Sequence, residues 1–342
     1  MAVITTFGEI MLRLSPPGRE FLFQSPRLEA SFGGGEANVA VSLALLGHDV
    51  RYVSAIPKND VGEAALRELR KWGVDTRFVR RRGRRLGIYF AETGANQRAS
   101  KVVYDRDGSG IAEAKPGDFD WPRILAGSAW FHVTGITPAL SAAAADLALE
   151  SVRAARAANV RVSVDLNYRA KLWKYGKSAP EVMPEVVKCA DLLIGNEEDC
   201  QMALGIGTTA GVAAGKLAAK DYERLTAEVM NAFPNLTRAA VTLRESHGAS
   251  HNGWSAVMRT RTGFLAGPSY DIRDIVDRIG SGDAFAAGLI HGLAILPTDG
   301  EALAFAVAAS CLKHSIPGDF NLATEKDILA LMAGDASGRV RR

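Results

Sequence analysis

Asp277-Arg278-Ile279-Gly280-Ser281-Gly282-Asp283-Ala284-Phe285 is a turn of small residues followed directly by a carboxylate and by an apolar run that continues to Leu293. Glycines at 280 and 282 let the backbone point its N–H groups outward, and the first turn of a following helix adds unpaired donors and the positive end of the helix dipole. The stretch therefore predicts an anion site that fits a transferred phosphoryl group. Asp283 at its rim repels an anion, so its expected role is to take a proton from an attacking hydroxyl.

Other interpretations of this stretch exist. Gly-x-Gly before a helix is common, and an aspartate at a helix start is usually only a cap. Two better-known phosphate motifs are excluded, because the dinucleotide fingerprint needs a glycine where Phe285 stands and the chain contains no Gly-x4-Gly-Lys-Ser/Thr. If the chain binds ATP, it does so with a fold other than those that carry these two motifs.

Composition excludes several classes of protein. With 342 residues, 47% hydrophobic and 23% charged, the chain can bury a full core as one large domain or as a domain with a smaller appendage. We expect a soluble globular protein that does not bind nucleic acid, because the net charge is only +3. The basic cluster at residues 80–85 has no interleaved aromatic residues for base stacking, which favours a solvated strand edge or turn.

Cysteine usage and the N-terminus bear on location. Cys189, Cys200 and Cys311 are odd in number and match no zinc or disulfide spacing, which is typical of reduced thiols in a cytoplasm. Residues 1–10 have no basic region followed by a long apolar run, and no window reaches the ~20 apolar residues of a membrane span. We therefore expect a cytoplasmic protein without a membrane partner.

Strand-like and helix-like segments alternate along most of the chain. We predict strands at 3–9, 50–56, 130–133, 160–166, 191–195 and 239–243, a hairpin within 253–267, and helices at 39–46, 60–72, 142–158, 179–189, 283–294 and 300–314. The aperiodic segment 205–220 is expected to be a surface loop. Such alternation implies a parallel sheet with helices on both faces. Residues 11–32 and 77–110 instead have the pattern of short strands joined by turns. Together they predict a small sheet, which is a candidate lid.

Two glycine-to-helix junctions are more informative as a pair than singly. Gly33-Gly34-Gly35-x-x-Asn38 and Asp277-x-x-Gly280-Ser281-Gly282-Asp283 resemble the paired signatures of the ribokinase-like (PfkB-type) carbohydrate kinases. Within that family, Tyr104-Asp105-Arg106, the stretch from Asp165 to Trp173 and the stretch from Phe131 to Leu140 are similar to the 2-keto-3-deoxygluconate kinases. The resemblance runs from Ile4 to about Leu331 and is carried mainly by the pairing and order of the two signatures.

The resemblance implies a doubly wound, mainly parallel α/β fold with a β-sheet lid. Residues 1–10, 33–76 and 111–334 are then the nucleotide-binding core, 11–32 and 77–110 the lid, and 335–342 a polar tail. The implied reaction transfers the γ-phosphoryl group of ATP, with Mg²⁺, to the terminal hydroxyl of a keto-deoxy sugar acid. Pairing of lids in a homo-oligomer is expected, because the lid hairpins cannot bury both faces on one protomer.

The resemblance also assigns roles to individual residues. The general base is Asp283, and the amides of Gly280, Ser281 and Gly282 stabilise the transferring phosphoryl group. Gly34 and Asn38 hold sugar hydroxyls or carbonyls, Tyr89 and Tyr104 supply hydroxyl donors and a flat wall, and Arg106 and Arg169 bind the carboxylate. Asn196 and Asp199 organise Mg²⁺ through water, Asn196, Thr242, Arg244, Gly280 and Gly282 contact the nucleotide, and Asp277 belongs to a monovalent-cation loop.

Three departures from the family pattern bear on these roles. Asp199 replaces a glutamate and so reaches one methylene less far, and Arg244 stands where many relatives have glycine. Arg278 follows Asp277 where threonine is common, and its charge can repel or replace a cation there.

Alternative functions remain open. On the same fold a fructokinase or another ketose kinase is the rival enzyme, because that superfamily changes substrate through lid residues. A sugar-acid sensor without turnover and a nucleic-acid-binding protein are rivals of other classes. A sensor would gain nothing from a carboxylate beside a phosphate nest.

Overall fold

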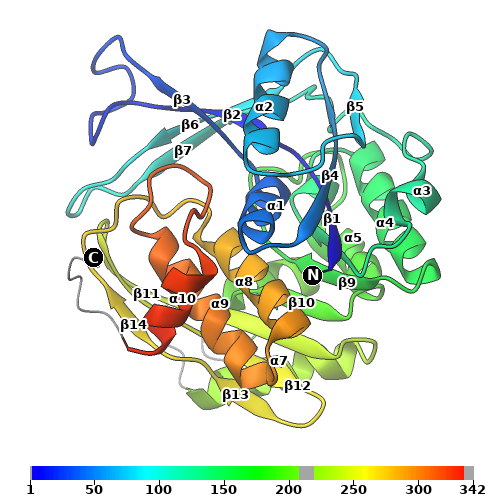
Figure 1. Cartoon of the computed structure of the whole chain (residues 1–342), viewed down its shortest axis with the longest axis vertical. Coiled ribbons are helices and arrows are strands. Elements are labelled where there is room, and N and C mark those ends of the chain that lie inside the picture. The colour runs from blue at the N-terminus through cyan, green and yellow to red at the C-terminus, as the bar shows by residue number, and fades with distance from the viewer. Residues whose placement is uncertain (1, 208–218, 335–342) are drawn as a thin grey trace.

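A large, mainly parallel sheet runs through the centre of the molecule (Figure 1), in a computed structural model that describes residues 2–207 and 219–334. Within that part of the chain the strand order is β13-β12-β11-β10-β9-β8-β1-β4-β5, and β14 pairs with β12. Its strands are β1 (Val3–Phe7), β4 (Asp49–Ile56), β5 (Val79–Arg81), β8 (Trp130–Thr134), β9 (Arg161–Asp165), β10 (Leu192–Gly195), β11 (Arg238–Gly248), β12 (His251–Thr260), β13 (Phe264–Ala266) and β14 (Tyr270–Ile272). Pairing is parallel from β11 to β5, whereas β12, β13 and β14 pair antiparallel.

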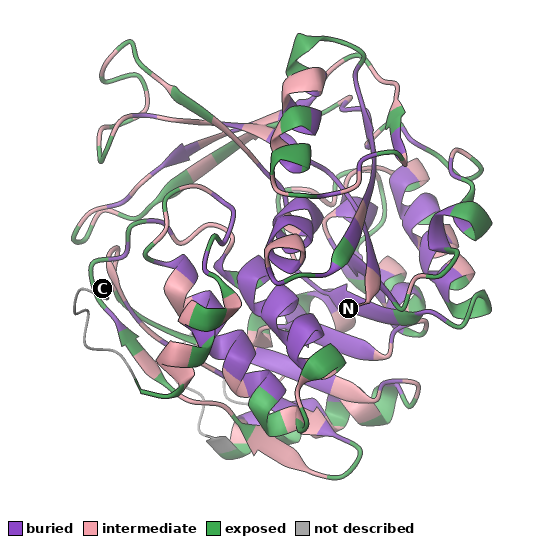
Figure 2. Cartoon of the chain, viewed as in Figure 1, coloured by how far each residue is buried: buried purple, intermediate pink, exposed green. Residues whose placement is uncertain are grey.

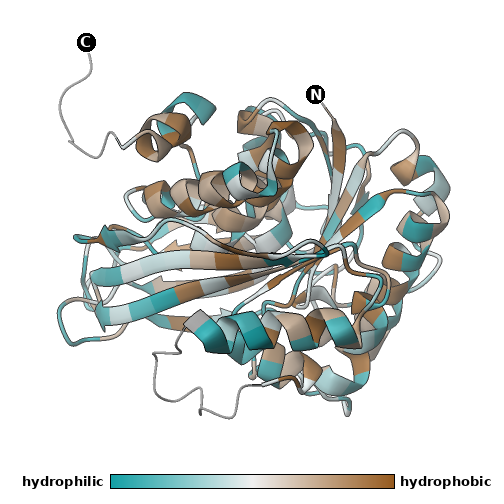
Figure 3. Ribbon diagram, turned by 90° about the horizontal axis from the view of Figure 1, so that it is seen from below, coloured by the Kyte–Doolittle hydropathy of each residue, from teal (hydrophilic) through white to brown (hydrophobic). Residues whose placement is uncertain are grey.

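Helices cover both faces of this sheet (Figure 3). One face carries α1 (Gly35–Leu45), α2 (Asp60–Lys71), α8 (Ser281–Ile295) and α9 (Asp299–Lys313), with α10 (Glu325–Met332) packed on α9. The other carries α3 (Trp121–Leu125), α4 (Ala142–Ala157), α5 (Ala179–Val187), α6 (Glu197–Leu204) and α7 (Ala219–Ala232), and a short 3-10 helix spans Thr137–Ala139. Buried residues concentrate in the sheet and in α1 and α8 (Figure 2). The expected ribokinase-like α/β architecture is confirmed.

A second, four-stranded sheet projects from one side of this body (Figure 1). Its order is β3-β2-β6-β7, from β2 (Met11–Ser15), β3 (Glu29–Gly33), β6 (Gly87–Glu92) and β7 (Lys101–Asp105). The pairs β2–β3 and β6–β7 are antiparallel hairpins, and β2 joins them by lying parallel to β6. This separate sheet is the expected lid.

Some local details differ from the expectations. Val79–Arg81 pairs with β4 at the edge of the large sheet, because its register continues the parallel crossover from α2, so residues 79–81 lie outside the lid sheet. The cap of α2 is Asn59, whose Oδ1 accepts the N–H of Gly62 at 2.9 Å. Helix α7 was not expected. Residues 208–218 of the predicted loop and the predicted tail 335–342 lie outside the described residues.

Four arginines of the basic cluster at residues 80–85 form ion pairs within the fold. Ion pairs join Arg81 to Glu63, Arg82 to Asp118, Arg84 to Glu113 and Arg85 to Asp105. Among the described helices, none is both long and apolar enough to cross a membrane.

Candidate active site

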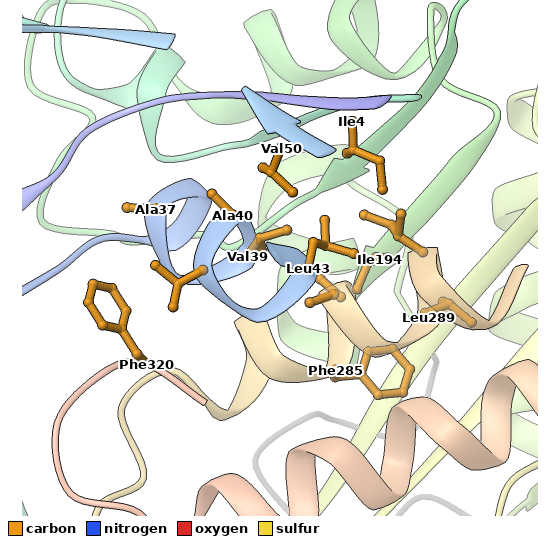
Figure 4. Packing of buried hydrophobic residues seen from close by; sticks show 14 of the residues in the cluster. Ile4, Ala37, Val39, Ala40, Leu43, Val50, Ile194, Phe285, Leu289 and Phe320 are labelled. Carbon is orange, nitrogen blue, oxygen red and sulfur yellow. The ribbon is translucent and has the colours of Figure 1, made fainter. Parts of the chain in front are cut away.

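The N-termini of α1 and α8 meet at one cavity because the two helices pack along their apolar faces. Val39 and Leu43 of α1 lie against Phe285 and Leu289 of α8 in the same buried cluster (Figure 4). Burial of such apolar side chains contributes about 1.5–3 kcal/mol each. Glycine precedes both helices, and a Cβ at Gly34 would lie 2.0 Å from the carbonyl oxygen of Glu9. The two glycine junctions of the sequence are therefore parts of one site.

Asp283 is buried in the first turn of α8. Asn38 Nδ2 donates to its Oδ2 at 2.7 Å, and Asn38 Oδ1 accepts the N–H of Gly34 at 3.2 Å. Burial raises the pKa of Asp283 to about 7, although the Asn38 hydrogen bond opposes the shift. A carboxylate with a pKa near the working pH suits a general base. In the structure Asn38 contacts this base, a partner that the sequence did not indicate.

The turn before α8 has the geometry of an anion nest. Gly280 adopts φ +84° as the N-cap, and a Cβ there would lie 2.0 Å from the carbonyl oxygen of Asp319. Ser281 donates its N–H to the carbonyl of Arg278 at 3.3 Å. The N–H groups of Gly282 and Asp283 lie in the first helical turn, where an α-helix leaves its donors without intrahelical partners. The first turn of α8 therefore offers N–H donors to an anion.

A cavity of about 1410 Å³ lies between the lid and the carboxyl ends of the large sheet's strands. Ligand pockets for one small molecule usually measure about 300–1,000 Å³, so this one has room for two substrates. All the site residues expected from the sequence line it: Gly34, Asn38, Tyr89, Tyr104, Arg106, Arg169, Asn196, Asp199, Thr242, Arg244, Asp277, Gly280, Ser281, Gly282 and Asp283.

Lid side chains form one wall of the cavity. Arg106 is 4% exposed and its guanidinium pairs with Glu9, while its Nη1 has no partner among the described residues. Tyr89 donates its hydroxyl to Asp319 at 2.6 Å, so this residue offers the cavity its ring, 6.1 Å from that of Tyr104. Exposed Arg169 follows β9 on the opposite wall. Two arginines from separate parts of the fold thus border one space.

Polar residues after β10 and within β11 line the other end. Asn196 and Asp199 form a reciprocal cap at the start of α6, and Asp199 Oδ1 also accepts the N–H of Tyr168 at 2.9 Å. Burial raises the pKa of Asp199 to about 6. Thr242 Oγ1 donates to the carbonyl of Gly195 at 3.4 Å, and Arg244 lies beside it. Across residues 2–207 and 219–334, no three acidic, histidine or cysteine side chains form a metal cluster.

Asp277 does not fit a monovalent-cation site. Its Oδ1 accepts the N–H of Ile279 at 3.0 Å, and its Oδ2 accepts the N–H of Gly318 at 3.1 Å and pairs with Arg13 at 2.7 Å. Both oxygens are therefore already bonded, one of them to a permanent positive charge. Arg278 turns away and donates to the carbonyls of Gly248 and Ala249, so it does not replace an ion here.

Sequence reasoning missed several residues at this site. Asp165 ends β9 inside the cavity, and burial together with the neighbouring charges of Asp199 and Asp283 raises its pKa well above the ordinary value. The signal was available, since Asp165 is a carboxylate at the carboxyl end of a buried strand. Arg13 and Asp319 had no local signal, because they are far apart in the sequence and meet only in the folded chain.

Comparisons with known proteins agree with this geometry. A family model described as "pfkB family carbohydrate kinase" matches residues 1–322. The chain is 43% identical to a solved 2-dehydro-3-deoxygluconokinase of Thermotoga maritima, with a TM-score of 0.92, covering 98% of this chain and 100% of that one. It is 30% identical to a 2-dehydro-3-deoxygalactonokinase of Haloferax volcanii (98% of both chains), and 26% identical to a 2-dehydro-3-deoxygluconokinase of Bacillus subtilis (95% of this chain, 93% of that one).

Proposed function

This chain belongs to the pfkB family of carbohydrate kinases, and we propose that it phosphorylates the terminal hydroxyl of 2-keto-3-deoxygluconate, also called 2-dehydro-3-deoxygluconate, with ATP. The observation that carries the choice of a sugar acid is Arg106, a residue of the cavity wall whose buried Nη1 has no hydrogen-bond partner in the described chain. A buried guanidinium nitrogen without a partner costs free energy, and a substrate carboxylate would satisfy it. A neutral hexose offers only uncharged oxygen acceptors, which make weaker hydrogen bonds to a guanidinium.

The reaction uses Asp283 and the nest before α8. The substrate hydroxyl oxygen attacks the γ-phosphorus, the bond from that phosphorus to the β,γ-bridging oxygen breaks, and ADP leaves with the bridging oxygen. Asp283 receives the hydroxyl proton, and Asn38 holds the carboxylate in place through its 2.7 Å hydrogen bond. The donors of the nest stabilise the charge that spreads over the phosphoryl oxygens.

Recognition of the sugar acid is divided between lid and core. Arg106 comes from the end of β7 and Arg169 from the segment after β9, so one carboxylate can contact both. The guanidinium carbon of Arg106 lies over the Tyr104 ring, 5.5 Å from its centroid. The rings of Tyr104 and Tyr89 together form a flat wall. Gly34 has no Cβ to hold its backbone away from the substrate, and its N–H donates to Asn38 Oδ1.

The nucleotide occupies the end of the cavity near Thr242 and Arg244 in this proposal. Mg²⁺ usually keeps several waters and is held largely by substrate phosphates, so it needs no preformed protein cage. Asp199 and Asn196 are engaged in the α6 cap and would contact the ion through water. When bound, Mg²⁺ neutralises the charge that develops on the phosphates.

A panel of acceptors tests the proposal. ADP release is measured with 2-keto-3-deoxygluconate, the galactonate-derived keto-deoxy acid, fructose and ribose, with Asp283→Asn as the control for background ATP consumption. We expect the highest kcat/KM on a keto-deoxy acid. A higher value on fructose would favour the ketose-kinase alternative. Tight binding of a sugar acid without turnover in any reaction would favour a sensor.

The lid also supports our proposal of a homo-oligomer. Residues of β6 alternate between the cavity and the outer face, where Phe90 lies 6.0 Å from the ring of Phe23. Phe23 is 69% exposed and Val103 is 40% exposed. An apolar outer face on an open sheet is typical of a surface that pairs with a second copy.

A further inference from the structure

Arg13 joins the lid to the segment before the catalytic helix α8 and to the segment after α9. It lies on lid strand β2 and is 5% exposed. Its Nη2 pairs with Asp277 at 2.7 Å and its Nη1 with Asp319 at 2.8 Å, while its Nε donates to Ser15 at 2.9 Å. All three nitrogens of the guanidinium are thus bonded, in a fork geometry that a lysine cannot reproduce.

The two carboxylates that Arg13 binds adjoin the anion nest. Asp277 precedes the turn that contains Gly280, and the carbonyl of Asp319 packs so closely on Gly280 that no Cβ fits between them. Asp319 also accepts the hydroxyl of Tyr89 from lid strand β6. The position of the nest therefore depends on Arg13 through two independent contacts.

A second buried cation lies on the other side of Asp277. Lys313, at the end of α9, is fully buried. Its Nζ donates to the carbonyl oxygens of Ile316 at 2.9 Å and Asp277 at 3.4 Å. Backbone carbonyl oxygens beside a carboxylate are the ligands that a hard monovalent cation would take, and here an ammonium group holds them. Burial lowers the Lys313 pKa, whereas Asp277 and Asp319 oppose that shift and favour the charged form.

The charges of this cluster balance. Arg13 and Lys313 are positive, Asp277 and Asp319 are negative, and all four are buried. Buried charges persist only when they are paired and hydrogen-bonded, and an added cation would meet the repulsion of two fixed ones. We propose that Arg13 and Lys313 take the place of an exchangeable monovalent cation, so that this kinase works without K⁺ or Na⁺, with Arg13 as a positioning residue for the catalytic turn.

The proposal rests on the kinase activity proposed above, and a salt series separates the two. The unmodified enzyme is assayed with ATP and its best sugar acid in chlorides of K⁺, Na⁺ and tetramethylammonium at equal ionic strength. We expect kcat/KM to change by less than about twofold between salts. Activation of about tenfold or more by K⁺ would overturn the inference while leaving the kinase function intact. Absence of turnover in every salt would instead count against the kinase function.

Lys313→Ala gives a second readout that a merely structural lysine would not show. Removal of the ammonium leaves carbonyl ligands and space, so K⁺ should restore activity at least about fivefold over tetramethylammonium and raise the Tm of this variant only. If the folded variant is impaired equally in all salts, Lys313 does not take the place of a monovalent cation. If the variant does not fold, the salt series on the unmodified enzyme still decides.

Arg13→Gln tests the positioning role. We expect kcat to fall at least about tenfold while the sugar-acid Kd changes little, because Arg13 contacts the catalytic turn rather than the substrate. Arg13→Lys should recover only part of the loss. Arg19→Gln is the matched control, an exposed lid arginine that should leave kcat unchanged. An unchanged kcat in Arg13→Gln would remove Arg13 from the inference.

Discussion

At the scale of single residues, the site depends on carboxyl groups whose surroundings differ. Asp283 and Asp199 are buried with raised pKa values of about 7 and about 6. Asp277 is paired with Arg13. We propose that the same functional group serves as a proton acceptor at position 283 and as an anchor at position 277. Environment, rather than residue type, separates these roles.

Replacing Asp283 with Asn should lower kcat by at least ~10²-fold, because an amide cannot accept the hydroxyl proton. Fold and sugar-acid affinity should be retained, since Asn38 can still donate to the amide oxygen. Steady-state kinetics and calorimetry measure the two effects separately. Turnover at the normal rate would exclude Asp283 as the base.

The pH dependence of kcat/KM should report the same group. The raised pKa of Asp283 means that the free enzyme holds the base protonated below about pH 7, so kcat/KM should rise with pH and level off above about 7. The shift also means that folding stability linked to this group is lost as pH rises through its folded pKa. The Tm of the Asp283→Asn variant should therefore lack this decrease with pH. A kcat/KM that stays constant from pH 5 to 8 in the unmodified enzyme would contradict the assignment of Asp283 as the base.

Arg169→Lys should weaken binding of the sugar acid by ~1–3 kcal/mol, because the charge is kept but the planar fork is lost. Affinity for ATP should stay near normal, since the carboxylate belongs to the other substrate. Titration calorimetry with each ligand separately checks this. Equal weakening of both ligands, or no change for the acid, would show that Arg169 does not hold the carboxylate.

At the scale of elements, the start of α8 depends on one glycine more than on its neighbour. Gly280 has φ +84° and no room for a Cβ against Asp319, whereas a Cβ at Gly282 would meet no atom within 4 Å in the described chain. Helix α8 is buried along most of its length, so it cannot shift to relieve such a clash.

Gly280→Ala should therefore cost ~2 kcal/mol or more in the free energy of unfolding, from the left-handed φ and the clash together. Gly282→Ala is the matched control and should not lower that free energy, because a Cβ there meets no atom within 4 Å in the described chain and alanine is favoured in a helix. Denaturant titrations of both variants make the comparison. Equal stabilities would mean that the turn relaxes freely.

At the scale of the whole molecule, the lid is an open sheet above a cavity for two substrates. Its inner face carries Tyr89 and Ala91 toward the cavity, and its outer face is apolar and partly exposed (Figure 2). Arg13 joins this sheet to the core. The lid therefore serves the site on one side and is available for assembly on the other.

Val103→Glu should convert the proposed oligomer to a monomer at micromolar concentration, because a charge on the outer lid face cannot be buried between two copies without cost. Light scattering on the purified protein measures the mass. Leu329→Glu is a control of similar exposure, 42% against 40%, on α10 away from the lid. A monomeric unmodified protein would contradict lid pairing.

Much of the fold follows from the sequence alone, because periodicity and turn chemistry involve neighbouring residues. The alternation of strands and helices, the two lid hairpins and the glycine turn before Asp283 are all local patterns, and the structure has them. Many residues that line the cavity could also be named, since small residues before a helix have a fixed geometric meaning. The unexpected place of β5 shows the limit, because a three-residue strand has too short a pattern to indicate its sheet.

Only the tertiary structure decided how these residues pair. Asn38 meets Asp283 across 245 positions and Arg13 meets Asp319 across 306, because the strand order brings β1, β2 and the N-terminus of α8 to one place. Burial in the folded chain also raises the pKa of Asp165, and the fold pairs Asp277 with Arg13. Ion pairs and desolvation depend on distances in space, and sequence separation carries no information about them.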